Sequence, residues 1–228
     1  MLNVYFENKP NDFPGIIIVQ SIITAFSSLT EIDNEQFKRG DISSVNCSEI
    51  NLASLKGLPQ TEFDLQCQSN KLTTLEGCPP IVNSFNCSRN PLTSLRGAPI
   101  EVLGVANFAE TQITSFEFLP TKMHSDCYLH SNIIASLQGI HKHFKNGFLK
   151  GRLIISPNIT SHLLGALLID ELREIGVMMS SGVGEDETSL VKAVKIINKH
   201  LLNELADRDL VDCQQQLIDA GLKVYAQL

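Results

Sequence analysis

Val45-Asn-Cys47-Ser-Glu-Ile50-Asn-Leu52-Ala-Ser-Leu55-Lys-Gly57-Leu-Pro59 is the first of three passages that can be laid over one another. The other two are Leu65-Gln-Cys67-Gln-Ser-Asn70-Lys-Leu72-Thr-Thr-Leu75-Glu-Gly77-Cys-Pro79 and Phe85-Asn-Cys87-Ser-Arg-Asn90-Pro-Leu92-Thr-Ser-Leu95-Arg-Gly97-Ala-Pro99. Matching residues lie 20 positions apart. An internal repeat of this length predicts a solenoid, in which each unit forms one coil and neighbouring coils share a continuous core.

Each unit combines an alternating strand pattern with a turn. Phe85 and Cys87 alternate with polar neighbours, so they are expected to point into the coil while Asn86 points outward. An asparagine follows the strand, and its side-chain amide can bond to backbone groups that the turn leaves unpaired. The asparagines expected to form such a ladder are Asn70, Asn90 and Asn132, and the glycines expected to take a positive φ on the return path are Gly57, Gly77, Gly97 and Gly139.

The same spacing continues beyond these passages, in the general form L-x-x-L-x-L-x-x-N-x-L-x-x-L of leucine-rich repeats. A fourth unit has Phe108 and Thr111 where cysteine and asparagine are expected, and a fifth follows from Cys127. We therefore predict an α/β repeat fold, a leucine-rich repeat solenoid over residues 42–158 with one short strand per coil of 20–21 residues. Units this short leave no room for a helix on the return path.

The two ends of the chain are expected to cap this array. Residues 1–41 are interpreted as an N-terminal cap that includes a β-branched strand at 16–19 and a degenerate repeat. Residues 159–228 are interpreted as a helical C-terminal cap. Three helices are predicted there: one over residues 161–175, one capped by Asp186 or Thr188, and one that runs from Asp209 to Tyr225.

Composition argues against several classes of partner. The 228-residue chain has a net charge of -7 and no run of lysine and arginine, which makes nucleic acid an unlikely direct ligand. The sequence shows no secretory signal and no apolar run long enough to span a bilayer. We therefore expect a soluble cytoplasmic protein without a membrane association, whose cysteines are reduced.

The residues with catalytic or metal-binding chemistry do not form a known motif. Cys47, Cys67 and Cys87 recur at one inward position and are expected to be buried packing residues, since no C-x-x-C pair occurs. No G-x-S-x-G, Walker or H-E-x-x-H motif is present. We expect no enzymatic activity, no cofactor and no metal. A small metal-binding enzyme remains an alternative, through Asp126, His130, His141 and His143.

The outward face of the strands carries the candidate binding residues. Three rows of side chains follow from the repeat register, and they end at Arg152, Ile154 and Ser156. The second half of the face gains aromatic and ionisable groups of the kind that interfaces favour. The candidate binding residues on this predicted concave face are Asp64, Gln66, Asn86, Asn107, Asp126, Tyr128, His130 and Arg152.

Cys87-Ser-Arg-Asn90-Pro-Leu92-Thr-Ser-Leu95-Arg-Gly97-Ala-Pro99 resembles the repeat C-S-x-N-x-L-T-S-L-x-G-x-P of a leucine-rich repeat family of tailed bacteriophages and bacteria. The tail from Cys213 to Ala226 is also similar to the endings of such proteins. The resemblance implies a phage accessory protein that works in the host cytoplasm and binds a host protein, and it brings no catalytic residues. The alternative is a structural protein that assembles through its capping helices. The sequence leaves the partner and the oligomeric state open.

Overall fold

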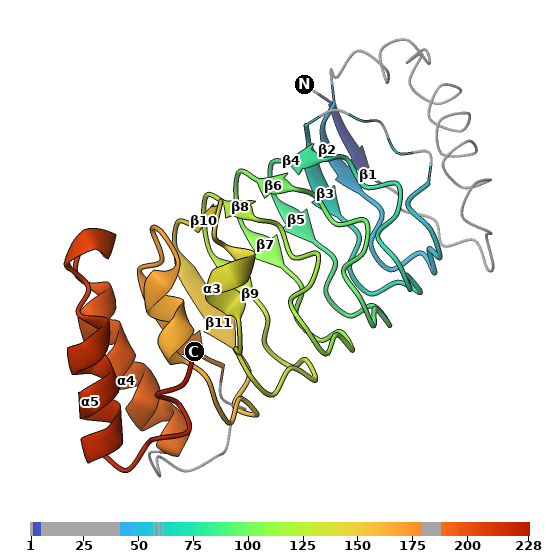
Figure 1. Cartoon of the computed structure of the whole chain (residues 1–228). Helices are drawn as coiled ribbons and strands as arrows, with labels where there is room; N and C mark the ends of the chain where they lie inside the picture. The colour runs from blue at the N-terminus through green and yellow to red at the C-terminus, as the bar shows by residue number, and fades with distance from the viewer. Residues whose placement is uncertain (1, 6–41, 57, 59, 61, 179–187) are drawn as a thin grey trace, which may run out of the picture.

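The computed structural model describes residues 2–5, 42–56, 58, 60, 62–178 and 188–228. Within these residues the chain forms a parallel β-solenoid, whose coils are stacked in one row (Figure 1). Strand β1 (Leu2–Tyr5) lies at one end of the row, and helices α4 (Ser189–Leu201) and α5 (Leu210–Asp219) lie at the other. The strand predicted at 16–19, with most of the proposed N-terminal cap, lies outside the described residues.

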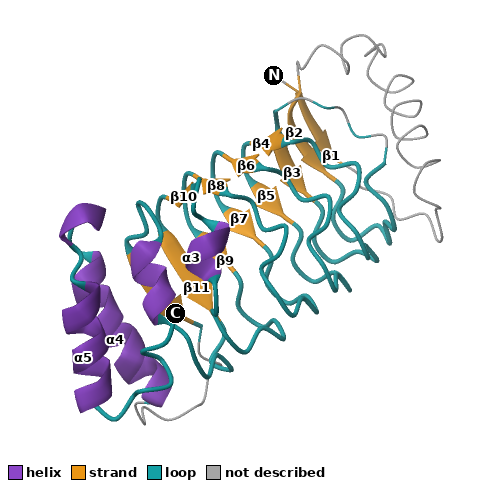
Figure 2. Cartoon of the chain, viewed as in Figure 1, coloured by secondary structure: helices purple, strands orange, loops and turns teal. Residues whose placement is uncertain are grey.

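One long parallel sheet runs the length of the array (Figure 2). Phe85 pairs with Leu65 on one side and with Ala106 on the other, so a coil takes 20 or 21 residues, as the sequence predicted. After β1, the strands in spatial order are β2 (Ile42–Asn46), β3 (Asp64–Gln66), β5 (Phe85–Asn86), β7 (Ala106–Asn107), β9 (Cys127–Tyr128), β11 (Arg152–Ile155) and β12 (Glu174–Val177).

A second, smaller parallel sheet was not predicted. Its four strands have two residues each, and β4 stands immediately before β5 in the chain. They are, in spatial order, β10 (Phe148–Leu149), β8 (Lys122–Met123), β6 (Glu101–Val102) and β4 (Ile81–Val82). The return path over residues 91–99 contains turns and no helix, which confirms that prediction. A short helix, α3 (Ile140–His143), lies between β9 and β10 in the chain.

In two neighbouring coils, the large and the small inward-pointing side chains occupy opposite positions of the strand. One coil places Phe85 and Cys87 inward, and the next places Ala106 and Phe108 at the corresponding positions. The two phenylalanine rings meet edge to face, with centroids 5.6 Å apart. Because the summed side-chain volume stays similar, the departure of Phe108 from the repeat pattern leaves the strand register intact.

The helix predicted over residues 161–175 is wrong. A 3₁₀ helix, η1 (Leu164–Leu168), occupies its first part, and its last residues enter strand β12. Leu172 and Ile175 are buried in the continuing core, whereas Leu168, which helical spacing placed on the apolar face, is 41% exposed. Parallel pairing of β12 with β11 therefore overrides the local periodicity, because it extends both the sheet and its core by one coil.

The last two helices begin at cap residues that the sequence predicted. The Thr188 hydroxyl accepts a hydrogen bond from the Val191 amide, and the Asp209 carboxylate accepts one from the Asp212 amide. A 3₁₀ turn, η2 (Leu205–Asp207), joins them. Helix α5 ends at Asp219, before the predicted end. None of the described helices has the length and apolar character needed to cross a bilayer.

Helix α4 closes the last edge of the long sheet. The Asn198 side chain accepts a hydrogen bond from the Ile175 amide at 2.8 Å and donates one to the Ile175 carbonyl at 2.9 Å. The Arg208 guanidinium donates to the carbonyls of Leu167, Ile169 and Leu172 at 2.8–3.0 Å. An open strand edge would present unpaired backbone groups to other chains, and Asn198 bonds those of Ile175 on the edge strand β12.

Candidate functional site

All eight candidate binding residues lie on the outward side of the long sheet. Gln66, Asn86, Asn107 and Tyr128 are paired in register on four neighbouring strands, and Asn46 extends this row by one strand. We use the name long-sheet face for the outward-pointing residues between Ser44 and Arg152. They belong to the strands β2, β3, β5, β7, β9 and β11 and to the residues directly after each strand. The row continues in register to Ile154, which pairs with Tyr128, but Ile154 and Ser156 are buried and offer no surface to a partner.

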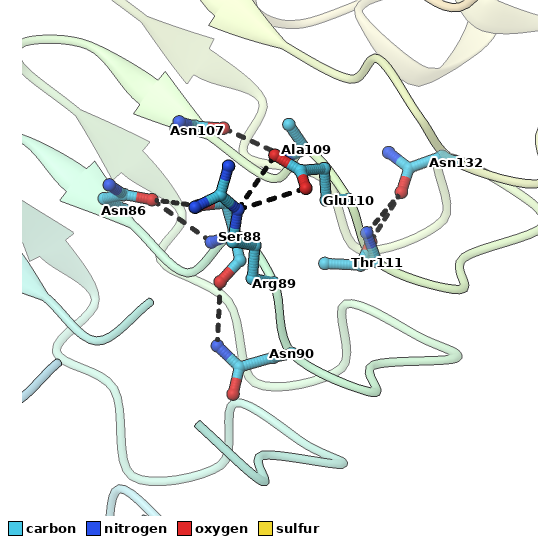
Figure 3. Close-up of polar contacts among 9 residues, drawn as sticks. All are labelled: Asn86, Ser88, Arg89, Asn90, Asn107, Ala109, Glu110, Thr111 and Asn132. Carbon is cyan, nitrogen blue, oxygen red and sulfur yellow. Dashed lines mark hydrogen bonds and ion pairs between the residues drawn. The ribbon is translucent and has the colours of Figure 1, made fainter. Parts of the chain in front are cut away.

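The half-buried asparagines of this row are held in one orientation. The Asn86 amide oxygen accepts hydrogen bonds from the backbone amide of Ser88 at 3.1 Å and from its hydroxyl at 2.8 Å (Figure 3). The Asn107 oxygen accepts from the Ala109 amide at 3.0 Å. A backbone N–H can only donate, so the atom facing it must be the amide oxygen, and the NH₂ group must point away.

A second set of asparagines lies inside the coils and forms the predicted ladder. The Asn90 NH₂ group donates to the carbonyls of Cys67 and Cys87 at 3.0 Å each, and its oxygen accepts from the Leu72 amide at 3.0 Å. Asn70 and Asn132 make corresponding bonds between their own coil and the preceding one. This set is buried and its hydrogen-bonding capacity is used, so it builds the fold.

Thr111 takes the ladder position in the fourth unit. Its hydroxyl lies 2.7 Å from the Asn132 side-chain oxygen (Figure 3). It also lies 3.1 Å from the Phe108 carbonyl. A hydroxyl has only one proton to donate, whereas an asparagine amide has two. The ladder therefore continues through Thr111 with fewer bonds than at Asn90.

The acidic candidates on the long-sheet face are tied to their neighbours. Asp64 accepts a hydrogen bond from the Ser84 amide at 3.0 Å. Asp126 accepts from the Arg152 guanidinium at 2.7 and 3.0 Å and from the Arg152 backbone amide at 2.8 Å. Partial burial raises the pKa of Asp126, but the hydrogen bonds and the charge of Arg152 outweigh it and hold the pKa below its usual 3.8.

Tyr128 and His130 form an aromatic pair at one end of the face. Their ring centroids are 6.0 Å apart, and the rings meet at 75°. The His130 Nδ1 atom is buried and makes no hydrogen bond within the described part of the chain. Burial lowers the pKa of His130, although the nearby Glu110 acts in the opposite direction. The ring is therefore held as a neutral imidazole near pH 7.

An ion pair at the border of this face was not predicted from the sequence. The Arg89 Nε atom lies 3.0 Å from both carboxylate oxygens of Glu110 (Figure 3). Both residues occupy the same turn position of consecutive coils, with φ values of 55° and 54°. The available signal was their opposite charge at equivalent positions 21 residues apart.

The residues with metal or redox chemistry are not gathered into a site. No group of three or more His, Cys, Asp and Glu side chains among the described residues could hold a metal ion. His143 Nε2 lies 2.9 Å from the Leu119 carbonyl, while Asp126 is paired with Arg152. The repeated cysteines are free and buried, and burial raises the pKa of Cys47 to about 12, so its thiol is unreactive near neutral pH.

No protein-family model, no curated protein and no solved structure matches the chain.

Proposed function

We propose that the protein is a non-catalytic binding module of the leucine-rich repeat type, which holds a protein partner on its long-sheet face. The observation that carries this proposal is the fixed orientation of the polar side chains there: Asn86 and Asn107 by backbone bonds, and Arg152 by Asp126. Side chains that are already ordered lose little conformational entropy when a partner binds. Tyr128 and Arg152 are also of the residue types that contribute most at interfaces.

The resemblance of the repeats to those of phage proteins supports a narrower proposal. On this proposal the chain works in the cytoplasm of an infected bacterium and binds a host protein, either to counter a defence or to alter a host enzyme. Its contribution is recognition alone, without a cofactor or a metal.

Affinity capture from a bacterial lysate tests the proposed function. The full chain should retain a discrete host protein, and Tyr128→Ala should weaken that retention about tenfold or more, as for a central interface residue. Thr93→Ala is the control, because Thr93 is exposed on the return path and away from the long-sheet face. Equal retention by both variants, or no retained protein at all, would contradict the proposal.

Self-assembly through the capping helices is the second candidate function. The observation that favours it is apolar exposure at that end of the array, where Leu202 is 83% exposed and Val211 is 75% exposed. Light scattering at rising protein concentration tests it. A mass that grows with concentration, and returns to the monomer value in Val211→Lys, is expected if these helices pair. A constant monomer mass would rule this candidate out.

A further inference from the structure

Helix α5 presents an apolar stripe to solvent at the end of the array. Figure 1 places α4 between the long sheet and α5, so one side of α5 packs on α4 and the other faces outward. The inward residues Cys213 and Leu217 are fully buried, whereas Val211 is 75% exposed and Ile218 is 40% exposed. Residues seven positions apart lie on the same face of a helix. Val211 and Ile218 therefore form one stripe on the outward side.

A second stripe, of carboxylates, runs beside the apolar one. Asp212 and Asp219 each follow a residue of the first stripe, so they lie about 100° further round the helix, and both are exposed. Gln216 Nε2 donates to the Asp212 carboxylate and Gln215 Nε2 to that of Asp219, each at 2.8 Å. No lysine or arginine in the described part of the chain forms an ion pair with either carboxylate, and His200 Nε2 lies 3.9 Å from Asp212. The carboxylates are thus held in place beside the stripe.

The chain before α5 adds to both features. Residues 202–222 contain five carboxylates and one arginine, Arg208, whose guanidinium is directed to three main-chain carbonyls of the solenoid. Leu202 is 83% exposed and Leu205 is 38% exposed. This end of the molecule is therefore apolar and acidic at the same time. We use the name α5 face for Leu202, Leu205, Val211, Asp212, Ile218 and Asp219.

We infer that the α5 face binds a basic amphipathic helix of a partner protein. This contact goes beyond the binding function proposed for the long-sheet face, because it lies on a different surface. An amphipathic helix carries apolar residues along one face and can carry lysine or arginine at the flanking positions. When it lies along α5, its apolar stripe covers Val211 and Ile218, and its cations reach Asp212 and Asp219, as flanking charges do beside the seam of a coiled coil.

The charge of the α5 face selects among the possible occupants. An acidic surface repels the phosphates of nucleic acid and of anionic lipid. A second copy of this chain fits less well, because a symmetric contact sets one patch against itself and would bring the carboxylates of two copies together. A cationic helix instead forms charge pairs with the carboxylate stripe. Such exposed pairs are screened by salt, so the binding should depend on ionic strength.

The probe is a synthetic three-heptad peptide with leucine at positions a and d, lysine at e and g, and alanine elsewhere. Its lysines repel one another across a pair of helices, which keeps the peptide from pairing with itself. A matched peptide carries glutamate in place of lysine. Calorimetric titration into the full chain should show that the lysine peptide binds and the glutamate peptide does not. Added salt should weaken the binding several-fold.

Two substitutions test the two stripes separately. Val211→Ser removes an exposed apolar side chain, and Asp219→Lys reverses a charge at the C-terminal end of α5, where the helix dipole favours lysine. Each should weaken binding of the lysine peptide about tenfold. Ile133→Ser and Glu117→Lys make the same changes at exposed positions of the return path, and these matched controls should bind like wild type. Thermal melts check that all four variants keep the fold.

Several results would overturn the inference. Wild type that does not bind the lysine peptide at about 1 mM would do so, as would equal binding of the lysine and glutamate peptides. Equal binding by Val211→Ser, Asp219→Lys and their controls would place the contact elsewhere. A mass that grows with protein concentration, and does not grow in Val211→Ser, would show that a second copy covers the α5 face. The proposed function is tested separately, because it depends on Tyr128 and the long-sheet face.

Discussion

Asn86 and Asn90 stand four residues apart in one coil, and their side chains have opposite roles. The Asn90 amide lies inside the array and bonds to four backbone groups of two coils. The Asn86 amide lies outside, where its oxygen is bonded to Ser88 and its nitrogen faces away. The difference follows from strand and turn geometry, since one residue precedes the turn on the outward side and the other enters the coil. The same residue type thus builds the fold at one position and offers a donor at the other.

The largest effect is expected for Asn90→Asp. Aspartate can still accept from the Leu72 amide, but it cannot donate to the carbonyls of Cys67 and Cys87, and it places a charge in a buried position. The free energy of unfolding should fall by about 3 kcal/mol or more, since buried polar groups lose their partners. Urea denaturation measures this change. A loss below about 0.5 kcal/mol would show that the buried ladder does not hold the coils together.

A gain of stability is expected for Thr111→Asn. Asparagine at this position would restore the repeat, with a second N–H to donate where the Thr111 hydroxyl has one proton. One added buried hydrogen bond should raise the free energy of unfolding by about 1 kcal/mol. Thr93→Asn, on the exposed return path, is the control and should change little. If Thr111→Asn is less stable than wild type, the fourth coil is shaped for threonine and the ladder is not a single repeating device.

The ladder could be predicted from the sequence because it depends only on repeat spacing. Asn70, Asn90 and Asn132 follow the strand at a fixed interval, and the turn leaves backbone groups that an amide can bond. The stacked strands and the caps of α4 and α5 followed from equally local patterns. Strand β12 could not be predicted in this way, because its sequence has helical spacing and only pairing with β11 decides its conformation.

The candidate site was predictable in position but not in chemistry. Period-two alternation places Asn86, Asn107 and Tyr128 on the outward face, and the structure puts them in one row. Alternation cannot show which end of an amide faces outward, because that depends on the hydrogen bond to the residue two positions later. The packing of Phe85 against Phe108 could not be predicted for a similar reason. It depends on which large and small side chains face each other in two neighbouring coils, and the pattern of a single repeat does not show this.

The two regions should also differ in their response to acid. The buried ladder is uncharged, whereas the long-sheet face contains Asp126, whose pKa is held below 3.8 by Arg152. A carboxyl with a lowered pKa in the folded state stabilises the fold above its unfolded pKa, and this contribution disappears as the pH falls through the folded pKa. Asp126→Asn should therefore reduce the loss of stability below pH 3.8, with a smaller effect than Thr111→Asn has. Denaturation at several pH values measures it, and identical pH profiles would contradict the assignment.

The smallest effect on stability is expected for Asn86→Asp, although it is the same substitution as at Asn90. The Ser88 amide and hydroxyl keep a carboxylate oxygen to bond, and the second oxygen faces outward, where water can solvate it. The free energy of unfolding should change by less than about 0.5 kcal/mol, as for other surface substitutions. Urea denaturation beside Asn90→Asp provides the comparison under one condition. If Asn86→Asp proves as damaging as Asn90→Asp, the outward row would belong to the framework of the fold, and a loss of partner binding in that variant could no longer be assigned to its side-chain NH₂ group.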